Sequence, residues 1–332
     1  MYTSIYCREI PPLIKQLLET PEMQRLSDVG MNCGCEYTSF PIYKQARMHY
    51  TRYIHSIGVA NIIWNFTEDI TQTVAGLFHD IATPAFAHTI DFMNQDYLEQ
   101  ESTESRTREI IENSSEIKGL LAKNHISADD VADYHMYPIA DNDTPKLSAD
   151  RLEYALGDGY LIQNVDLEQI RRIYQDIIVM ENEAGEWELG FKSIEMAKAF
   201  TEISLWNSYW FVSDEDRFAM QYLADMIKNA LQSGCLTEAD LYRTEKEVIR
   251  LLQRNETIRS LWKQYTQISS VTASDSKPIA QYSVKVSAKK RYIDPLVLTP
   301  DEPKRISKIN SETGEKIQQF LRLDFNKFLY IS

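Results

Sequence analysis

An adjacent histidine and aspartate end a strongly apolar segment of this chain, and their burial constrains how the chain can fold. His79 and Asp80 close residues 69–81, where apolar side chains recur at the three- and four-residue spacing of a helix. Burying a carboxylate beside an imidazole costs several kcal/mol unless a metal ion or hydrogen bonds compensate. A divalent cation is the simplest compensation, so the fold must bring further ligands to this pair.

Two other predicted helices supply such ligands. His55 lies on a helix predicted over residues 52–66, where Gly58 permits a close helix contact. Asp150 falls in the first turn of a helix that Ser148 can cap. Two histidines and two aspartates suit an ion with octahedral preference, Mn, Fe, Mg, Co or Ni rather than zinc. The predicted ligands are His55, His79, Asp80 and Asp150. The alternative is that both histidines are hydrogen-bonded core residues.

The order of these residues resembles that of the HD-domain metal-dependent phosphohydrolases. Three blocks carry the resemblance: Arg52-x-x-His55-Ser-x-Gly-Val, Leu77-x-His79-Asp80-Ile-x-x-Pro-x-Phe-x-His88, and Asp150-Arg-Leu-Glu-Tyr154. Upstream, Gln24-Arg25-Leu26 is similar to a segment that precedes the first metal histidine in the deoxynucleoside triphosphate triphosphohydrolase-like branch. The resemblance covers residues 1–165 and is only suggestive beyond them.

The resemblance implies a mainly α fold, an HD-domain helical bundle with an inserted β-hairpin and a small β-containing C-terminal appendage. We predict an HD metal-binding helical core over residues 1–165 and a helical extension over residues 166–268. The hairpin is expected near residues 175–192, where two apolar runs flank a turn. A small α+β segment follows over residues 269–332, with a half-buried strand predicted at residues 282–289.

The resemblance also implies roles for individual residues. The enzyme would hydrolyse a nucleotide or related phosphate ester through a metal-activated water. Asp150, His88 and Arg52 are the implied catalytic residues, and the last two would stabilise or protonate the leaving group. Arg52, Tyr154 and Asp158 are the implied substrate contacts. The alternative for Tyr154 and Asp158 is a solvated acidic helix face.

The chain departs from the family pattern at two points. Ala82-Thr83 stands where many relatives have Gly-His, so one outer histidine is missing. Gln100-Glu101 takes about the place of a His-Glu pair. These departures support a second reading, in which a catalytically weakened HD protein binds metal and nucleotide as a sensor or assembly module.

A basic cluster near the C-terminus also has two readings. Lys285, Lys289, Lys290 and Arg291 could hold phosphates of a substrate or effector, or they could be the solvated face of an edge strand. We favour the edge strand.

Charge and composition narrow the partners and the location. With 35 Lys+Arg against 49 Asp+Glu, the net charge of −14 argues against general nucleic-acid binding. Four cysteines are too few for a disulfide-stapled secreted fold, and the sequence shows neither a signal peptide nor a membrane span. We therefore expect a cytoplasmic protein without a membrane partner.

Self-association is the last expectation from the sequence. Large aromatic residues crowd the predicted helical second half, and they fill the core or form an interface. They are Trp206, Tyr209, Trp210, Phe211 and Phe218. Relatives of this kind commonly assemble, so we predict a homodimer or a higher homo-oligomer.

Overall fold

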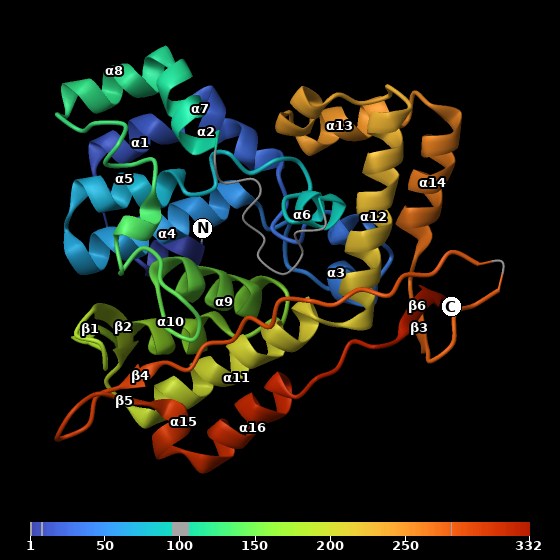
Figure 1. Ribbon diagram of the computed structural model, residues 1–332. Coiled ribbons are helices and arrows are strands. Elements are labelled where there is room, and N and C mark those ends of the chain that lie inside the picture. Colours follow the sequence, from blue (N-terminus) through green and yellow to red (C-terminus); the bar gives the residue numbers. More distant parts are fainter. Residues whose placement is uncertain (1, 8, 95–105, 280) are drawn as a thin grey trace.

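The computed structural model describes residues 2–7, 9–94, 106–279 and 281–332, and helices dominate it (Figure 1). The α-helices of the first half are α1 (Pro12–Leu18), α2 (Pro21–Arg25), α3 (Pro41–Lys44), α4 (Arg52–Thr67), α5 (Ile70–Phe78), α6 (Thr89–Met93), α7 (Thr107–Asn113), α8 (Ser115–Lys123) and α9 (Ala149–Leu161). Those of the second half are α10 (Leu167–Gln175), α11 (Ile194–Phe211), α12 (Asp214–Gln232), α13 (Glu245–Leu252), α14 (Glu256–Gln267), α15 (Ile306–Ile309) and α16 (Ser311–Leu321). Short 3-10 helices span Tyr2–Ile5, Leu26–Asp28, Cys35–Tyr37, Tyr134–Met136 and Glu238–Tyr242. The mainly helical fold class is confirmed.

Helix α4 is the central helix of the first half. The hydroxyl of Thr51 caps it by accepting a hydrogen bond from the backbone N–H of Ile54. The helix packs against both α5 and α9, and most residues between Arg52 and Ile63 are buried. Because neighbours cover it on more than one side, α4 can carry inward-facing polar groups that would be solvated on a surface helix.

The helix predicted over residues 69–81 ends earlier than the apolar pattern indicates. Helix α5 ends at Phe78, and turns follow over residues 79–82. The N–H of Ile81 donates to the carbonyl of Phe78 and that of Thr83 to the carbonyl of Asp80, each at 2.9 Å. These three-residue turns are tighter than an α-helix. They place His79 and Asp80 at the helix end, next to α4.

Two small sheets accompany the helices. In the larger one, β1 (Ile177–Glu181) pairs antiparallel with β2 (Trp187–Phe191), within the span predicted for a hairpin. Strand β2 pairs parallel with β4 (Leu296–Val297), which pairs antiparallel with β5 (Lys304–Arg305). The second sheet joins β3 (Val271–Ser274) antiparallel to β6 (Phe328–Ile331). Both sheets therefore join the last part of the chain to earlier elements.

The prediction of a β-strand at residues 282–289 is wrong. This segment is extended, but a single bridge between Val284 and Leu329 is its only ladder contact among the described residues. The carbonyl of Val286 accepts a hydrogen bond from the guanidinium of Arg217 at 2.6 Å instead. Val284 and Val286 are buried while Lys285 is exposed, so alternate burial produced the period of two without a neighbouring strand.

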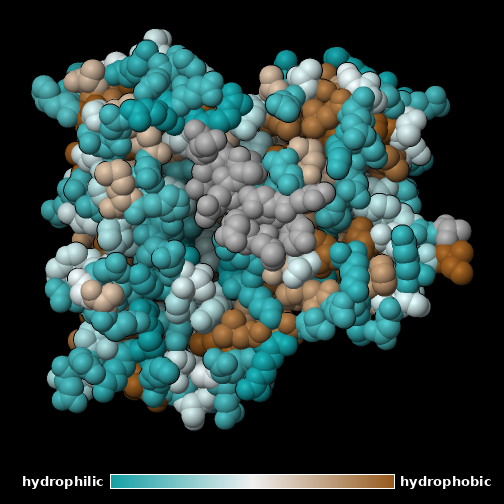
Figure 2. Space-filling model, viewed as in Figure 1, coloured by the Kyte–Doolittle hydropathy of each residue, from teal (hydrophilic) through white to brown (hydrophobic). Residues whose placement is uncertain are grey.

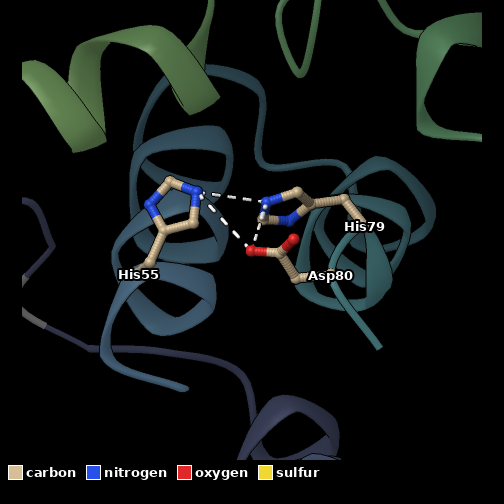
Figure 3. A group of neighbouring side chains, drawn as sticks. All are labelled: His55, His79 and Asp80. Atoms are coloured by element: carbon tan, nitrogen blue, oxygen red, sulfur yellow. Dashed lines mark hydrogen bonds and ion pairs between the residues drawn. The ribbon is translucent and has the colours of Figure 1, made fainter. Parts of the chain in front are cut away.

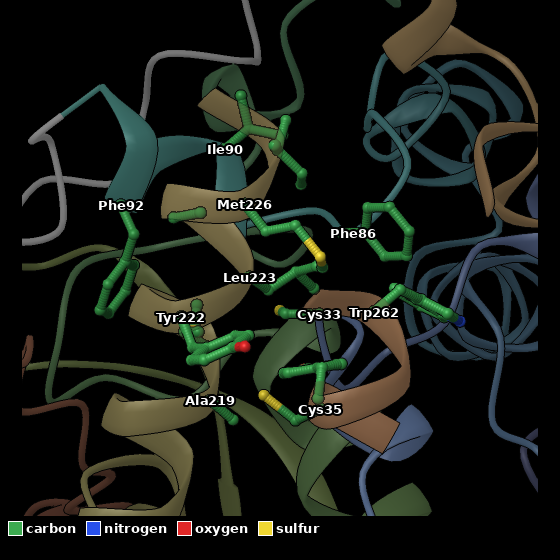
Figure 4. Packing of buried hydrophobic residues seen from close by; sticks show 14 of the residues in the cluster. Cys33, Cys35, Phe86, Ile90, Phe92, Ala219, Tyr222, Leu223, Met226 and Trp262 are labelled. Atoms are coloured by element: carbon green, nitrogen blue, oxygen red, sulfur yellow. The ribbon is translucent and has the colours of Figure 1, made fainter. Parts of the chain in front are cut away.

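A tight loop of the first half of the chain, at residues 33–35, packs against the helices α12 and α14. Figure 4 shows Cys33 and Cys35 packed against Leu223 of α12 and beside Trp262 of α14. Gly34 between them has a φ of +87°, and a Cβ there would lie 2.6 Å from a methyl carbon of Leu223. Only glycine fits this position, so the loop comes close enough to form one wall of the cavity described below.

Some expectations fall outside what the structure tests. Gln100 and Glu101 are not among the described residues. The division of the chain after residues 165 and 268 stays a prediction. Within the described ranges, every helix is too short or too polar to cross a bilayer.

Candidate metal centre and active site

A cavity of about 750 Å³ opens between the two halves of the chain. Its walls come from α4, the turn after α5, α6, α9, α12 and the segment at residues 288–291. Every residue that the sequence predicted for metal binding, catalysis or substrate binding lines it. They are Arg52, His55, His79, Asp80, His88, Asp150, Tyr154 and Asp158. A cavity of this size suits a small organic ligand.

Three side chains converge at the base of this cavity (Figure 3). His55 comes from α4, and His79 and Asp80 come from the end of α5. Nε2 of His79 lies 3.1 Å from Nε2 of His55 and 3.3 Å from Oδ2 of Asp80. Oδ2 of Asp80 lies 4.0 Å from Nε2 of His55. Two ring nitrogens and one carboxylate oxygen therefore face a common point.

Each histidine is oriented by a hydrogen bond at its other ring nitrogen. Nδ1 of His79 donates to the carbonyl of Gly76 at 2.7 Å, and Nδ1 of His55 donates to the carboxylate of Glu153 at 2.5 Å. Because an acceptor fixes the proton on Nδ1, Nε2 is the lone-pair nitrogen of the neutral ring. Outer partners of this kind orient metal-binding histidines in proteins.

Glu153 was not predicted from the sequence. It is fully buried on α9, it accepts a hydrogen bond from the hydroxyl of Tyr50, and it lies against α4. A Cβ at Gly58 would lie 2.4 Å from Cγ of Glu153, so Gly58 makes room for this carboxylate. The spacing Asp150-x-x-Glu153 is the signal that could have revealed it, because residues i and i+3 share a helix face.

Asp150 lies beside the same cluster. Its Oδ1 is 2.9 Å from Nε2 of His55 and 3.7 Å from Nε2 of His79. Ser148 caps α9 by accepting from the N–H of Arg151, which holds Asp150 in the first helical turn as predicted. The carboxylate thus reaches the two lone-pair nitrogens from the side of α9.

Asp80 is held by two further groups. Nη1 of Arg52 donates to Oδ1 of Asp80 at 2.7 Å, and the hydroxyl of Thr83 donates to the same oxygen at 2.7 Å. Burial raises the pKa of Asp80, but Arg52, His79 and His55 together outweigh burial and hold that pKa well below its usual range. Thr83 stands where many relatives have a histidine, and its hydrogen bond helps to orient the Asp80 carboxylate.

His88 lies on another wall, at the start of α6. Its Nδ1 lies 2.9 Å from Oδ2 of Asp91, a fully buried carboxylate that accepts the Nδ1 proton. Burial is the main cause that lowers the pKa of His88, and the hydrogen bond with Asp91 opposes it only in part. His88 is therefore neutral at pH 7, with Nε2 as its proton-accepting atom.

Tyr154 and Asp158 continue the face of α9 that carries Asp150. The ring of Tyr154 packs edge-on against Phe211, with centroids 6.2 Å apart. Asp158 is buried, and its Oδ1 has no hydrogen-bond partner among the described residues. Burial, followed by the charge of Glu153, raises the pKa of Asp158 to about 7. This carboxyl can donate or accept a hydrogen bond near neutral pH.

The cluster fits a divalent cation. Oδ2 of Asp80 is buried without a hydrogen-bond partner among the described residues, although it points at the two histidines. Burial lowers the pKa of His55, but hydrogen bonds with Asp150 and Glu153 outweigh burial and raise it to about 10. The surrounding carboxylates thus favour positive charge at this point, and a nitrogen and oxygen donor set of this kind binds borderline divalent ions.

Sequence comparisons identify the same region. The model of the HD domain family matches residues 52–154. The uncharacterized protein YdhJ of Bacillus subtilis is 26% identical over 303 residues, which cover 88% of this chain and 86% of that protein. The metal-dependent phosphohydrolase cns2 of Cordyceps militaris is 26% identical over 175 residues, which cover 52% of this chain and 48% of that protein.

Solved structures share the fold over almost the whole chain. A hypothetical protein from Aquifex aeolicus has a TM-score of 0.65 at 17% identity and covers 97% of this chain and 93% of its own. A phosphohydrolase from Bacteroides thetaiotaomicron has a TM-score of 0.65 at 15% identity. The match covers 98% of this chain and 97% of that phosphohydrolase. At such identities the likeness shows the fold alone. Residues 52–154 thus match the HD domain family, and the whole chain shares the fold of these two solved structures.

Proposed function

We propose that this protein is a metal-dependent phosphohydrolase that acts on a nucleotide or a related phosphate ester. The observation that carries the proposal is the convergence of His55, His79 and Asp80 at the base of a cavity large enough for such a substrate. The phosphohydrolase names of two related proteins support it. We also propose that the protein belongs to the deoxynucleoside triphosphate triphosphohydrolase-like branch of the HD superfamily.

The proposed ligands of one divalent ion are His55, His79, Asp80 and Asp150. Mn, Fe, Ni, Co or Mg suits these nitrogen and oxygen donors. Such an ion supplies Lewis-acid polarisation of a phosphoryl group and activation of water. Glu153 and the carbonyl of Gly76 hold the two imidazoles in place for it.

Arg52 and His88 have different tasks in this proposal. Arg52 fixes Asp80 and presents its positive charge to the cavity, where it stabilises negative charge that develops on a phosphate. His88 is neutral, and its Nδ1 proton is engaged by Asp91. Its Nε2 can therefore take a proton and return it to a leaving oxygen.

Tyr154 and Asp158 favour a nucleotide among phosphate esters. The tyrosine offers a ring edge and a hydroxyl to a sugar or base, and the buried Asp158 carboxyl leaves Oδ1 without a partner among the described residues. Thermal-shift titration in Mn²⁺ with deoxynucleotides and ribonucleotides tests this assignment, because a ligand that binds the native state must stabilise it.

The test of the activity is a hydrolysis screen over nucleotides and phosphomonoesters with added divalent metals. We expect turnover by the wild type and none by Asp150→Ala, whose helix keeps its buried Leu152 and Leu156. Asp143→Ala, which changes a carboxylate at the cavity rim, is the matched control. Stoichiometric metal without hydrolysis of any compound would favour the sensor or assembly reading.

Self-association and a cytoplasmic location complete the proposal. Trp206 and Tyr209 are each 41% exposed, whereas Phe218 is buried in the core. Figure 2 shows apolar side chains in separate patches on a mostly hydrophilic face. All four cysteines are free thiols, which suits a reducing compartment. Light scattering at micromolar concentration tests for a dimer: a mass of 38.6 kDa, that of the single chain, would exclude it.

A further inference from the structure

The short loop at residues 84–87 leads from the turn after α5 to His88, and its backbone is strained. Phe86 and Ala87 have φ angles of +64° and +43°, in the left-handed region that residues other than glycine rarely adopt. Both residues are buried. Such a conformation persists only where the surrounding contacts determine it. The contacts that hold this loop therefore decide where His88 lies.

Two of these contacts come from the second half of the chain. The backbone N–H of Ala85 donates to the carbonyl of Leu241 at 2.7 Å, and that of Phe86 donates to Oε1 of Glu245 at 3.2 Å. Leu241 lies in the 3-10 helix Glu238–Tyr242, and Glu245 is the first residue of α13. Acceptors far along the chain thus hold two successive amides of the loop.

Glu245 is fully buried, and both of its carboxylate oxygens accept hydrogen bonds. Oε1 also accepts from the N–H of Gly30 at 3.0 Å, and Oε2 accepts from the hydroxyl of Tyr37 at 2.7 Å. Burial raises the pKa of Glu245, and the hydrogen bonds from these donors oppose that rise. Burial, followed by the charge of Glu245, raises the pKa of the neighbouring Glu36 to about 8. Glu36 therefore holds the proton at pH 7, and Glu245 is the ionised acceptor.

Loss of the Glu245 carboxylate would act on the backbone of the loop. A buried N–H that loses its acceptor destabilises the conformation that buries it, and Phe86 is in this position. The ring of Phe86 would keep its own contacts: Figure 4 shows it beside Trp262, and the two ring centroids lie 6.1 Å apart. The effect should therefore fall on the chain just before His88 rather than on the aromatic packing.

The turn that carries the proposed metal ligands is held separately. Nη2 of Arg25 donates to the carbonyls of Ile81 and Thr83 at 3.0 and 2.7 Å. Arg25 thus fixes the turn after α5, whereas Glu245 fixes the loop that follows this turn. The two parts of one segment can therefore be disturbed independently.

We propose that Glu245 is a positioning residue for His88, because it fixes the strained loop at residues 84–87 and thereby the direction from which the imidazole enters the cavity. This inference rests on the proposed function, in which His88 exchanges a proton with the leaving oxygen. It makes α13 necessary for that step, although none of the described residues of α13 lines the cavity.

The first test follows His88 directly and needs no turnover. Histidine labelled with ¹³C at Cε1 is incorporated into protein loaded with diamagnetic Mg²⁺, and the NMR signal of His88 is identified by its loss in His88→Gln. The variant is Glu245→Gln. The matched control is Glu256→Gln, which makes the same change at the exposed first residue of α14. Metal titrations and thermal melts accompany both variants.

We expect the His88 signal to shift in Glu245→Gln and its titration midpoint to rise by about one pH unit. The reason is that a looser loop exposes an imidazole whose pKa is lowered mainly by burial. Metal affinity should remain that of the wild type, since Arg25 still holds the turn that carries the ligands. Glu256→Gln should match the wild type in every measurement.

An unshifted His88 signal in folded Glu245→Gln would overturn the proposal. A parallel loss of metal affinity would also overturn it, because it would indicate a general structural role. If Glu245→Gln does not fold, Tyr37→Phe decides, since it removes only the hydroxyl that orients Oε2. This variant should shift the same signal by a smaller amount, and no shift would again overturn the proposal.

Turnover supplies a second readout, which depends on the proposed function. With any phosphate ester that the wild type hydrolyses, Glu245→Gln should lower kcat by about tenfold or more and change KM little, because His88 acts on the leaving group. A shifted His88 signal with unchanged kcat would overturn the role in catalysis. Failure of the wild type to hydrolyse any ester would instead reject the proposed function and leave the His88 measurements valid.

Discussion

The carboxylate of Glu153 lies 2.5 Å from Nδ1 of His55, and this contact sets the orientation of the central imidazole of the site. Glu153 comes from α9 and His55 from α4, so the contact also joins the two helices that contribute Asp150 and His55. One buried carboxylate thereby couples the packing of the helices to the geometry of the proposed metal ligands.

Replacing Glu153 with glutamine should weaken metal binding. Glu153→Gln keeps the volume and removes the charge that orients His55, so we expect metal affinity or turnover to fall by about ten- to a hundredfold. Metal titration and turnover assays measure both quantities. Glu202→Gln, an exposed change on α11, is the control and should behave as the wild type does. Wild-type metal affinity in Glu153→Gln would show that His55 needs no such partner.

Loss of His79 should remove the metal. We expect about one divalent transition-metal ion per chain in protein purified without chelator and a large loss in His79→Ala, since Nε2 of His79 points at His55 and Asp80. Elemental analysis decides the matter. His49→Ala changes an exposed histidine and should retain the ion. Equal metal content in wild type and His79→Ala would refute the assignment.

Two glycine substitutions should have opposite effects. Gly58→Ala would place a Cβ 2.4 Å from Cγ of Glu153, so the side chain or the helix must shift, and both stability and metal affinity should fall. Gly119→Ala on α8 meets nothing within 4 Å and should stabilise the protein by up to about 1 kcal/mol. Urea unfolding and metal titration test the pair. Equal effects of the two changes would show that the contact at Gly58 is not tight.

A buried ion pair should contribute to stability away from the cluster. Arg305 makes hydrogen bonds of 2.6 and 2.9 Å with Glu188, which is fully buried and also accepts from the N–H of Leu147 just before α9. Arg305→Met leaves that carboxylate uncompensated, so we expect a loss of about 3–5 kcal/mol in the free energy of unfolding. Arg172→Met, at an exposed pair, should cost about 1 kcal/mol or less. A similar small loss for both variants would contradict the prediction.

Asp216 should make stability depend on pH. Burial raises its pKa to about 8, opposed in part by a hydrogen bond with the Cys35 thiol, whereas an unfolded aspartate titrates near about 3.9. Between these values the folded protein binds more protons, so the contribution of Asp216 is present in acid and is lost as pH rises through the folded pKa. We therefore expect the free energy of unfolding, measured with urea across this pH range, to decline less steeply with pH in Asp216→Asn than in the wild type. Asp301→Asn, at an exposed site, should leave the slope unchanged. An unaltered slope in Asp216→Asn would rule out this residue as the cause.

Local patterns in the sequence were enough to predict the helices that carry the site. The spacing of apolar residues and the cap at Ser148 are properties of neighbouring residues, and α4 and α9 form where those patterns predict. The order of His55, His79-Asp80 and Asp150 likewise predicted side chains that the fold brings into one cavity.

Only the tertiary structure decided the contacts between distant segments. The spacing to Asp150 places Glu153 on the same helix face, but its role depends on the space that Gly58 leaves in another helix. The alternation at residues 282–289 indicated which side chains are buried, but it did not indicate the hydrogen-bond partners of the backbone. The carbonyl of Val286 accepts a hydrogen bond from Arg217 rather than from a neighbouring strand. The segment at residues 288–291 lines the cavity between helices that are distant in the sequence, and this placement depends on the packing of the whole chain rather than on local spacing.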